Sequence, residues 1–275
     1  MTANFPLRPL LLLFFVLQLA SARAQDGVFP TVGARSYFLG GTGLNATGAE
    51  AVWTNPAGLA GAAPGLQGTT LAERRFGLSE LTATSLGASY HLENSGFGLQ
   101  LATLGFDTYR ETRVGLAYGR QIGERFRLGG EFTGFGTSTA GYASSFDVTF
   151  GLGLQVMILP ELHVGTRVFS PLRTERLPEE YLPQLLAFGV SYRPTKQLLI
   201  DTEVHQSPDF PLRFRAGLEY LPAEELSIRL GVVTEVTELS FGLGYRVWDR
   251  VEFTAGARWH EVLGVWPGVG VRYVE

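Results

Sequence analysis

A strict alternation of apolar and polar residues recurs from about residue 80 to the C-terminal end of the chain. In its longest run, SFDVTFGLGLQVMI (145–158), every second position from Phe146 to Ile158 is apolar. The positions between them carry aspartate, threonine, glycine and glutamine as far as residue 155. Because successive side chains of a strand point to opposite faces, a two-residue period indicates strands with one apolar face. The sequence therefore predicts an all-β protein.

About fourteen such segments follow one another, although a count of 12 stays open. The turns after even-numbered segments are short and polar, such as ENSG (93–96) and PAEE (222–225), whereas those after odd-numbered segments vary and reach their greatest length at 170–183. Alternating turn classes predict an up-and-down antiparallel barrel. The expected strands lie near 64–76, 80–92, 96–105, 109–120, 125–138, 143–158, 161–170, 184–193, 197–206, 210–221, 225–235, 237–247, 250–260 and 264–274.

The apolar stripe of such a barrel faces inward in a soluble protein and outward in a membrane protein. Here the apolar face consists almost entirely of large side chains, which suit lipid better than a crowded interior. The opposite face carries charges of both signs, which a polar lumen accommodates as pairs. We therefore predict a transmembrane β-barrel whose luminal charges form a wall network, with a selectivity surface as the alternative role. The charged residues expected in the lumen are Arg113, Arg127, Glu131, Asp147, Arg167, Asp201, Glu203, Arg213, Arg215, Glu219, Arg229, Glu238, Arg246, Glu252 and Arg258.

A second repeat, G-x-x-Y, occurs on six of the even-numbered strands and places a tyrosine on the apolar face near the same strand end. Tyrosine is common in strands for packing reasons alone. A shared level, face and strand end instead indicate an aromatic girdle at a membrane interface, where the ring lies among acyl chains and the hydroxyl among headgroups. The predicted girdle consists of Tyr90, Tyr118, Tyr192, Tyr220, Tyr245 and Tyr273.

The N-terminal residues 1–24 have the features of a secretory signal peptide. Arg8 precedes the apolar run LLLLFFVLQLA (10–20), which is too short to span a bilayer as a helix, and Ala22-Arg23-Ala24 offers a cleavage site. The mature chain is expected to begin at Gln25. We therefore predict export to the outer membrane of a Gram-negative bacterium, with outer-membrane lipid as the surrounding partner.

Composition excludes several classes of function. The chain has no cysteine, so a disulfide scaffold, a cysteine nucleophile and a cysteine zinc site are excluded. Without Arg8 and Arg23 the mature chain carries 20 basic and 26 acidic residues, a net charge of −6. Nucleic acid would require a basic patch and is not an expected partner.

Catalytic motifs of the hydrolase, zinc-protease and phosphate-loop types are missing from the sequence. The histidines, His91, His163, His205 and His260, lie on different strands and are better explained as wall residues than as metal ligands. His205, Ser207 and Asp209 cluster near a turn, but their spacing along one strand does not supply the geometry of a catalytic triad. We therefore expect no catalytic residue, metal or cofactor.

Residues 25–63 differ from the barrel, which is assigned to 64–275. This segment lacks sustained alternation, is rich in glycine and alanine, and contains an Asn-Pro turn. Glycines on the predicted inner face leave space in the lumen, so the segment is expected to fold inward as a plug, with a periplasmic extension as the alternative. These glycines are Gly115, Gly119, Gly151, Gly153, Gly189, Gly217, Gly242 and Gly244.

Within this segment GARSYFLGG (33–41) and GAEAVWTNPAGLAG (48–61) resemble the N-terminal signature of the FadL-like outer-membrane superfamily. That superfamily includes long-chain fatty-acid transporters and the PorV and PorQ proteins of the type IX secretion system. The resemblance implies a 14-stranded barrel with the NPA segment inside it. It further implies that the plug motif, Asn55, Pro56, Ala57 and Gly58, fixes the plug at the start of the first strand.

The sequence also departs from the transporters of that superfamily, which have long extracellular loops and a kinked strand that serves as a lateral exit. Most loops here are a few residues long, the third strand FGLQLATLG (97–105) has no proline, and Tyr273 is followed by Val274 and Glu275. Short loops favour a PorV/PorQ-type component that handles secreted proteins or secretion-system subunits. The alternative is a FadL-like passive transporter of hydrophobic small molecules.

Overall fold

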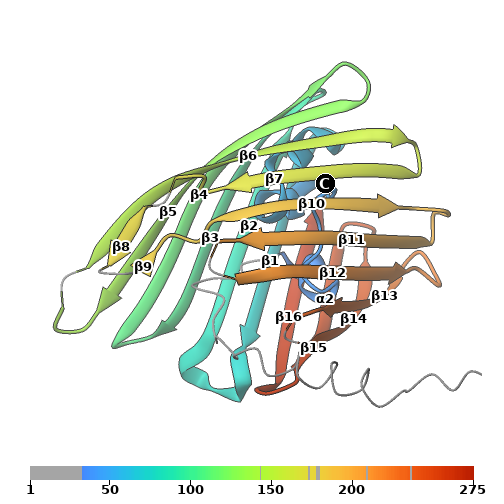
Figure 1. Cartoon of the computed structure of the whole chain (residues 1–275). Coiled ribbons are helices and arrows are strands. Elements are labelled where there is room, and N and C mark those ends of the chain that lie inside the picture. The colour runs from blue at the N-terminus through green and yellow to red at the C-terminus, as the bar shows by residue number, and fades with distance from the viewer. Residues whose placement is uncertain (1–32, 143, 173, 178–179, 209, 236) are drawn as a thin grey trace, which may run out of the picture. The chain divides into compact units, whose positions relative to one another are not determined.

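The computed structural model describes residues 33–275 apart from 143, 173, 178, 179, 209 and 236, so the expected signal peptide lies outside the described residues. Within the described part, fourteen strands pair edge to edge and close into a single antiparallel barrel (Figure 1). This confirms the predicted fold class and the higher of the two strand counts. The barrel strands are β1 (Gly65–Arg74), β2 (Thr82–His91), β3 (Ser95–Phe106), β4 (Tyr109–Ile122), β5 (Phe126–Thr139), β6 (Ser145–Leu159), β7 (Leu162–Phe169), β10 (Leu185–Tyr192), β11 (Leu198–Ser207), β12 (Phe210–Tyr220), β13 (Leu226–Val233), β14 (Glu238–Val247), β15 (Val251–His260) and β16 (Gly264–Val274).

Each strand pairs with the next in the chain, β7 pairs with β10, and β1 closes the barrel against β16. The closing seam runs in register from Gln67↔Val274 to Glu73↔Gly268. The third strand is also continuous, because every residue of β3 from Ser95 to Phe106 has a partner on β4. The third strand, which is kinked in the transporters that the sequence resembles, is therefore paired along its whole length here.

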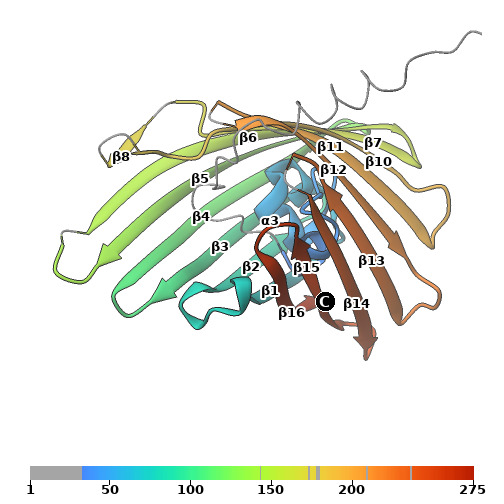
Figure 2. The ribbon, with the colours of Figure 1, turned by 60° about the horizontal axis from the view of Figure 1, so that its bottom comes forward.

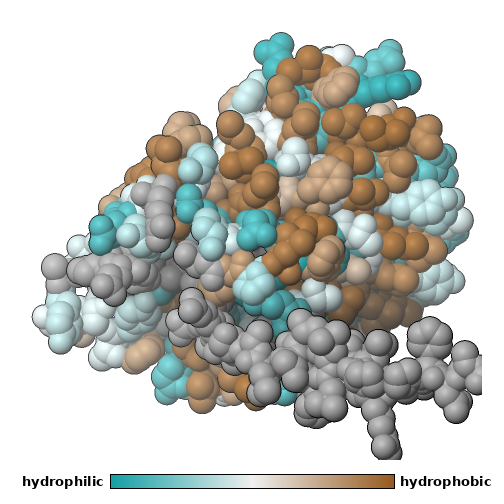
Figure 3. All heavy atoms as spheres, in the orientation of Figure 1, coloured by the Kyte–Doolittle hydropathy of each residue, from teal (hydrophilic) through white to brown (hydrophobic). Residues whose placement is uncertain are grey.

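The two faces of the wall differ as the alternation predicts. Large apolar side chains such as Phe132 on β5, 69% exposed, point outward, whereas Glu131 and Thr133 beside it are buried in the lumen. Figure 3 shows hydrophobic residues spread over one face of the barrel exterior. A closed sheet with an apolar exterior satisfies its backbone hydrogen bonds internally, as a membrane-spanning structure requires. None of the described helices is long and apolar enough to cross a membrane.

The chain enters the lumen before it forms the first strand. Residues 33–61 fold into short helices inside the barrel (Figures 1 and 2). These are α2 (Ala34–Phe38), η2 (Gly48–Glu50), α3 (Ala51–Thr54) and η3 (Pro56–Gly61). Most of their side chains are almost fully buried. We call residues 33–61 the plug.

Two connections at the end opposite the tyrosines contain structure that the alternation did not predict. The β1–β2 connection forms η4 (Arg75–Gly77) and η5 (Ser79–Leu81), so β1 and β2 are shorter than expected. Phe76 adopts a left-handed backbone conformation there, and its ring packs edge-on against Trp266. The expected long turn at 170–183 contains a separate two-stranded sheet of β8 (Glu175–Leu177) and β9 (Glu180–Tyr181).

The orientation of the wall can be tested with an arginine at two depths on the outer face of β5. Phe132→Arg, near the middle of the strand, should destabilise the folded protein in lipid vesicles by about 2–4 kcal/mol, whereas Phe126→Arg at the strand end should cost about 0–1 kcal/mol. The measurement is urea unfolding of both variants in the same vesicles. Equal losses at the two positions would contradict a membrane-facing exterior.

Candidate functional site

The plug is fixed to the wall at Asn55, the first residue of the NPA turn. Its side-chain oxygen accepts a hydrogen bond from the Ala57 amide at 3.1 Å and caps η3, whose first residue is Pro56. Its side-chain nitrogen donates to the carbonyl of Leu44 at 2.9 Å, and to two wall carbonyls, Leu154 on β6 and Thr166 on β7, at 3.2 and 3.3 Å. The Asn55 side-chain amide thus links the NPA turn to Leu44 of the plug and to the wall strands β6 and β7.

Glycines on the inner wall allow the plug backbone to approach the strands closely. A Cβ atom at Gly153 would overlap the Asn55 side chain, and one at Gly129 or Gly119 would overlap the backbone of Pro56. On the other side of the lumen, a Cβ at Gly242 would overlap the ring of Phe38. Of the eight glycines expected to leave room in the lumen, five therefore lie against the plug, and the other three, Gly115, Gly151 and Gly244, lie against wall side chains.

Two buried carboxylates satisfy backbone N–H groups in the N-terminal half of the plug. Glu50 accepts from the amides of Arg35 and Ser36 at 3.2 and 3.3 Å and from the hydroxyl of Thr69 on β1 at 3.0 Å. Glu203 on β11 accepts from the amides of Gly43 and Leu44 at 2.6 and 2.7 Å. Since a buried N–H without a partner is costly, these carboxylates stabilise the irregular chain inside the barrel.

Wall arginines satisfy the carbonyl groups of the plug. Arg167 on β7 donates to the carbonyls of Trp53 and Thr54 at 2.8 and 2.9 Å, and its guanidinium also pairs with Glu131. Arg258 on β15 donates to the carbonyl of Tyr37 at 2.9 Å.

Arg215 on β12 donates to the carbonyl of Gly41 at 3.2 Å. Together with Arg167, Arg258 and Glu203, it shows that several predicted luminal charges bind the plug backbone as well as one another.

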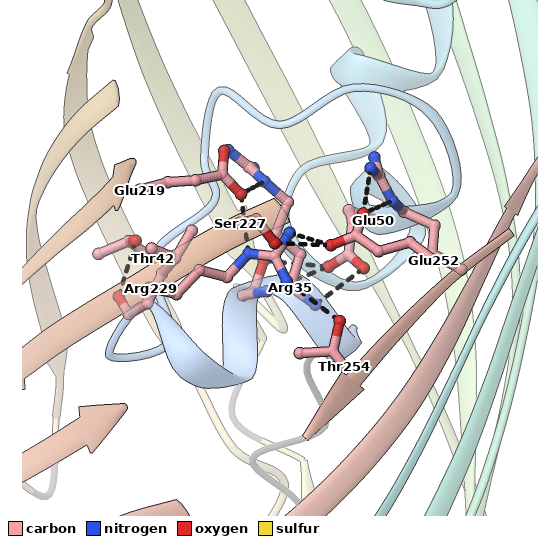
Figure 4. A network of polar contacts seen from close by, with 11 residues as sticks. Arg35, Thr42, Glu50, Glu219, Ser227, Arg229, Glu252 and Thr254 are labelled. Carbon is pink, nitrogen blue, oxygen red and sulfur yellow. Dashed lines mark hydrogen bonds and ion pairs between the residues drawn. The ribbon is translucent and has the colours of Figure 1, made fainter. Parts of the chain in front are cut away.

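A chain of ion pairs links α2 to four strands, β12, β13, β15 and β16 (Figure 4). Arg35 on α2 donates two hydrogen bonds to Glu219 on β12, at 2.9 and 2.6 Å. Glu219 also accepts from Arg229 at 2.8 Å, Arg229 pairs with Glu252, and Glu252 pairs with Arg272 at 2.6 Å. Burial disfavours the charge of Arg35, but the Glu219 carboxylate outweighs this effect and raises the pKa of Arg35 above its ordinary value.

The lumen differs on the two sides of the plug. Towards the tyrosine end lies a cavity of about 430 Å³, lined by charged residues that include Arg35, Arg127, Asp201 and Glu252. We call it the vestibule.

Towards the opposite end, Phe135 on β5 and Phe169 on β7 form a buried apolar cluster with Leu182 from the long connection, and Leu185 packs against it. Arg113 lies over both phenylalanine rings, 5.5 and 5.3 Å from their centroids, and within 5.7 Å of the Trp53 ring. The lumen near the mouth opposite the vestibule therefore contains a buried apolar and aromatic cluster.

The remaining predicted residues lie on the expected faces but do not converge on one site. Tyr90, Tyr118, Tyr192, Tyr220 and Tyr245 are exposed on the outer surface, whereas Tyr273 is half-buried beside the closing seam. A role for them as a membrane girdle stays a prediction. The luminal charges Asp147 and Arg213 also face inward, outside the ion-pair chain described above, whereas Arg246 lies opposite Glu252 and lines the vestibule.

The chemistry considered for a membrane enzyme does not assemble among the described residues. His205 shares a hydrogen bond with Glu203 at 2.7 Å, Ser207 lies beyond a register shift, and Asp209 lies outside the described residues. His91 contacts the Leu59 carbonyl of the plug at 2.7 Å. In the described ranges no group of three or more histidine and acidic side chains is arranged to hold a metal ion.

Sequence reasoning missed the residues that the plug itself contributes, chiefly Arg35, Glu50 and Trp53. Glu50 carried a recognisable signal, because it is a lone acidic residue in a stretch of glycine, alanine and apolar residues. An acid in such surroundings is rarely buried without hydrogen-bond donors. Arg35 carried no comparable signal, since its partner Glu219 lies 184 positions away.

Solved structures with the same architecture are outer-membrane channels. The CymD monoaromatic hydrocarbon channel superposes with a TM-score of 0.72 at 14% identity, over 90% of this chain and 99% of that one. The Pseudomonas putida toluene transporter TodX superposes with a TM-score of 0.69 at 13% identity, over 91% and 99%. A Pseudomonas aeruginosa FadL homologue gives 0.61 at 10% identity, over 89% and 97%.

At these identities the likeness establishes the fold, a FadL-like closed barrel of fourteen strands. No protein-family model matches the sequence, and no curated protein matches it. The three channels support the FadL-like part of the resemblance. They give no support to a nearest relationship with PorV and PorQ, which stays a prediction.

The importance of the Asn55 amide can be tested with Asn55→Ala. The substitution removes one donor from the Leu44, Leu154 and Thr166 carbonyls, of which Leu44 keeps a bond from Gln155, and it removes the acceptor of the Ala57 amide. The lost hydrogen bonds should destabilise the plug by about 1–3 kcal/mol. Hydrogen exchange of residues 42–61 should accelerate, while the barrel strands stay protected.

Asn45→Ala is the matched control, because the Asn45 side chain makes only two long hydrogen bonds to wall carbonyls, both at 3.4 Å. Equal acceleration in the two variants would show that Asn55 is not the specific anchor.

The ion-pair chain gives a second prediction. Glu219→Gln leaves the buried Arg35 and Arg229 guanidinium groups without their shared charge partner, and removing one member of a buried pair typically costs about 3–5 kcal/mol. The variant should lose its folded, heat-modifiable gel band at a clearly lower temperature. Asp107→Asn, which removes an exposed pair with Arg110 at 3.9 Å, should change stability by less than about 1 kcal/mol. Similar shifts for the two variants would contradict the importance of the chain.

Proposed function

We propose that the protein is an outer-membrane channel for hydrophobic small molecules in a Gram-negative bacterium, the second of the two functions that the sequence left open. The observation that carries the proposal is a plugged fourteen-stranded barrel with an apolar and aromatic cluster in the lumen on the side of the plug opposite the vestibule. This cluster consists of the buried side chains Phe135, Phe169 and Leu182. The architecture is shared with channels described as acting on monoaromatic hydrocarbons and toluene.

In this proposal a molecule enters through the mouth lined by Phe135 and Phe169 and leaves through the charged vestibule. We place the vestibule on the periplasmic side, where the predicted signal peptide would deliver the mature N-terminus. The path runs along the lumen, because β3 is continuously paired and offers no gap in the wall. The plug fills the lumen between the two ends, so transport requires the plug to shift or to unfold in part.

The hydrogen bonds and ion pairs of the plug divide it into two parts with different freedom. The segment 51–61 packs its backbone against glycines of β3 to β6 and is held by Asn55. The segment 33–50 also lies against glycines, on β12 to β16, and is held in addition by ion pairs and hydrogen bonds from Glu203, Arg215 and Glu219. Such polar contacts exchange with water at low net cost. We assign the movement to 33–50, which carries the Arg35–Glu219 ion pair.

The proposed function predicts that cells lacking the gene take up labelled toluene or a labelled long-chain fatty acid more slowly than cells carrying it. Uptake should be measured at low external concentration, where the outer membrane limits the rate. Unchanged uptake of both compounds would contradict the proposal. If the surface protein composition changed instead, the secretion-type function would replace it.

A reversible lock tests the role of the plug. The chain has no cysteine, so Thr42→Cys with Gly217→Cys introduces a single possible disulfide. A Cβ atom at Gly217 would lie 2.6 Å from the Thr42 side-chain oxygen, within reach of a bond between the plug and β12. It would also lie 2.7 Å from the Leu39 carbonyl, so Gly217→Cys alone is the control for displacement of the plug by the added side chain. Uptake should be lost on oxidation and return on reduction, while each single-cysteine variant stays active. Transport by the fully oxidised pair would show that 33–50 does not move.

A further inference from the structure

The outer surface of the barrel is hollowed over the closing seam. The hollow has a volume of about 760 Å³ and extends from β2 across β1 and β16 to β13. We call it the seam groove. The outward side chains that line its centre are Thr70, Ala72, Leu243, Ala255, Val269 and Val271.

The groove has a physical cause on the inner side of the same strands. Gly242, Gly256 and Gly268 carry no side chain into the lumen, and a Cβ atom at any of them would meet Phe38 or Tyr37 of α2. The backbones of β14 to β16 therefore lie close to the plug. The outer surface over these strands is correspondingly hollowed. On β1 the outward positions Thr70 and Ala72 are too small to refill the hollow.

The groove does not open into the lumen. The pairing of β1 with β16 and with β2 is continuous across it, as is that of β15 with β16. A molecule in the groove consequently lies on the membrane side of an intact wall. The groove is separate from the path proposed for transport.

The shape of the groove also argues against a second copy of the chain as its occupant. A two-fold interface places the same surface patch of both copies against each other. Two hollows facing each other would enclose an empty space instead of packing. A flexible apolar chain from the surrounding membrane fills a hollow of this kind.

One end of the groove has the features of a headgroup site. Tyr245, one of the exposed tyrosines, lines the groove at this end. The turn that joins β14 to β15 follows and carries Trp248, 83% exposed, and the exposed Arg250. The Val274 amide at the end of β16 donates to the Arg250 carbonyl at 2.8 Å, which places Arg250 beside the seam.

None of the described residues forms an ion pair with Arg250, so its positive charge is available to an anionic group. Tyrosine, tryptophan and arginine at one level are typical of the membrane interface. We propose that the seam groove binds one phospholipid, with an acyl chain against Ala255 and Val269 and the phosphate at Arg250.

The test uses the purified full-length protein from lipid nanodiscs containing phosphatidylethanolamine and phosphatidylglycerol, analysed by native mass spectrometry after gentle removal of bulk lipid. The unmodified protein should retain one phospholipid. Ala255→Trp places a large ring in the groove between Leu243 and Val269, its cross-strand neighbours, and should reduce the retained fraction at least several-fold. Arg250→Gln should also reduce it, because the phosphate loses its cation.

Val148→Trp is the matched control, since it adds the same ring to the outer face of β6, far from the seam in the strand order. It should retain lipid as the unmodified protein does. The proposal is overturned if the unmodified protein retains no lipid, if Ala255→Trp retains as much as Val148→Trp, or if a dimer survives in place of the lipid. Heat-modifiable migration of each variant verifies folding, and the outcome is independent of the uptake assays.

Discussion

The structure depends on one constraint: an irregular segment inside a closed barrel must find a partner for each of its backbone N–H and C=O groups. Away from water, each backbone group without a hydrogen-bond partner raises the free energy of the folded state. The wall supplies these partners through side chains, with Glu203 accepting from plug amides and Arg167 and Arg258 donating to plug carbonyls. The plug adds its own carboxylate at Glu50. The mixed luminal charges are therefore a complementary surface for a particular backbone path.

The same constraint explains why glycines and charges occur together on the inner face. A charged side chain reaches the plug from a distance, whereas a glycine lets the plug backbone lie against the strand. Gly153 beside Asn55 and Gly242 beside Phe38 mark the two regions of closest approach. On the seam side, this closeness draws the wall inward and leaves the outer hollow that we assign to a phospholipid. Inner packing and outer shape are consequently two aspects of one arrangement.

The proposed channel function requires a plug that both seals the lumen and can open. In this proposal the part of the plug held by Asn55 would provide the seal, and the part held by the Arg35–Glu219 pair would move. Buried ion pairs suit this task because they specify one geometry while adding little net stability over an apolar alternative. In the proposed function, the apolar cluster towards one end of the lumen and the charged vestibule at the other would set the direction of passage.

The sequence by itself determined the β-barrel and the two faces of its strands, because the two-residue period is a local property of a strand with one apolar side. It left the number of strands open between 12 and 14, and the closed sheet decided for fourteen. It also indicated the plug, through glycines such as Gly153 on the inner face. It did not indicate that Arg35 pairs with Glu219, that Glu50 accepts a hydrogen bond from Thr69, or that the outer surface is hollowed at the seam. Those features depend on contacts between residues far apart in the chain, which no local period encodes. Only the closed tertiary structure brings these residues of the plug and the strands into contact and forms the hollow on the outer surface.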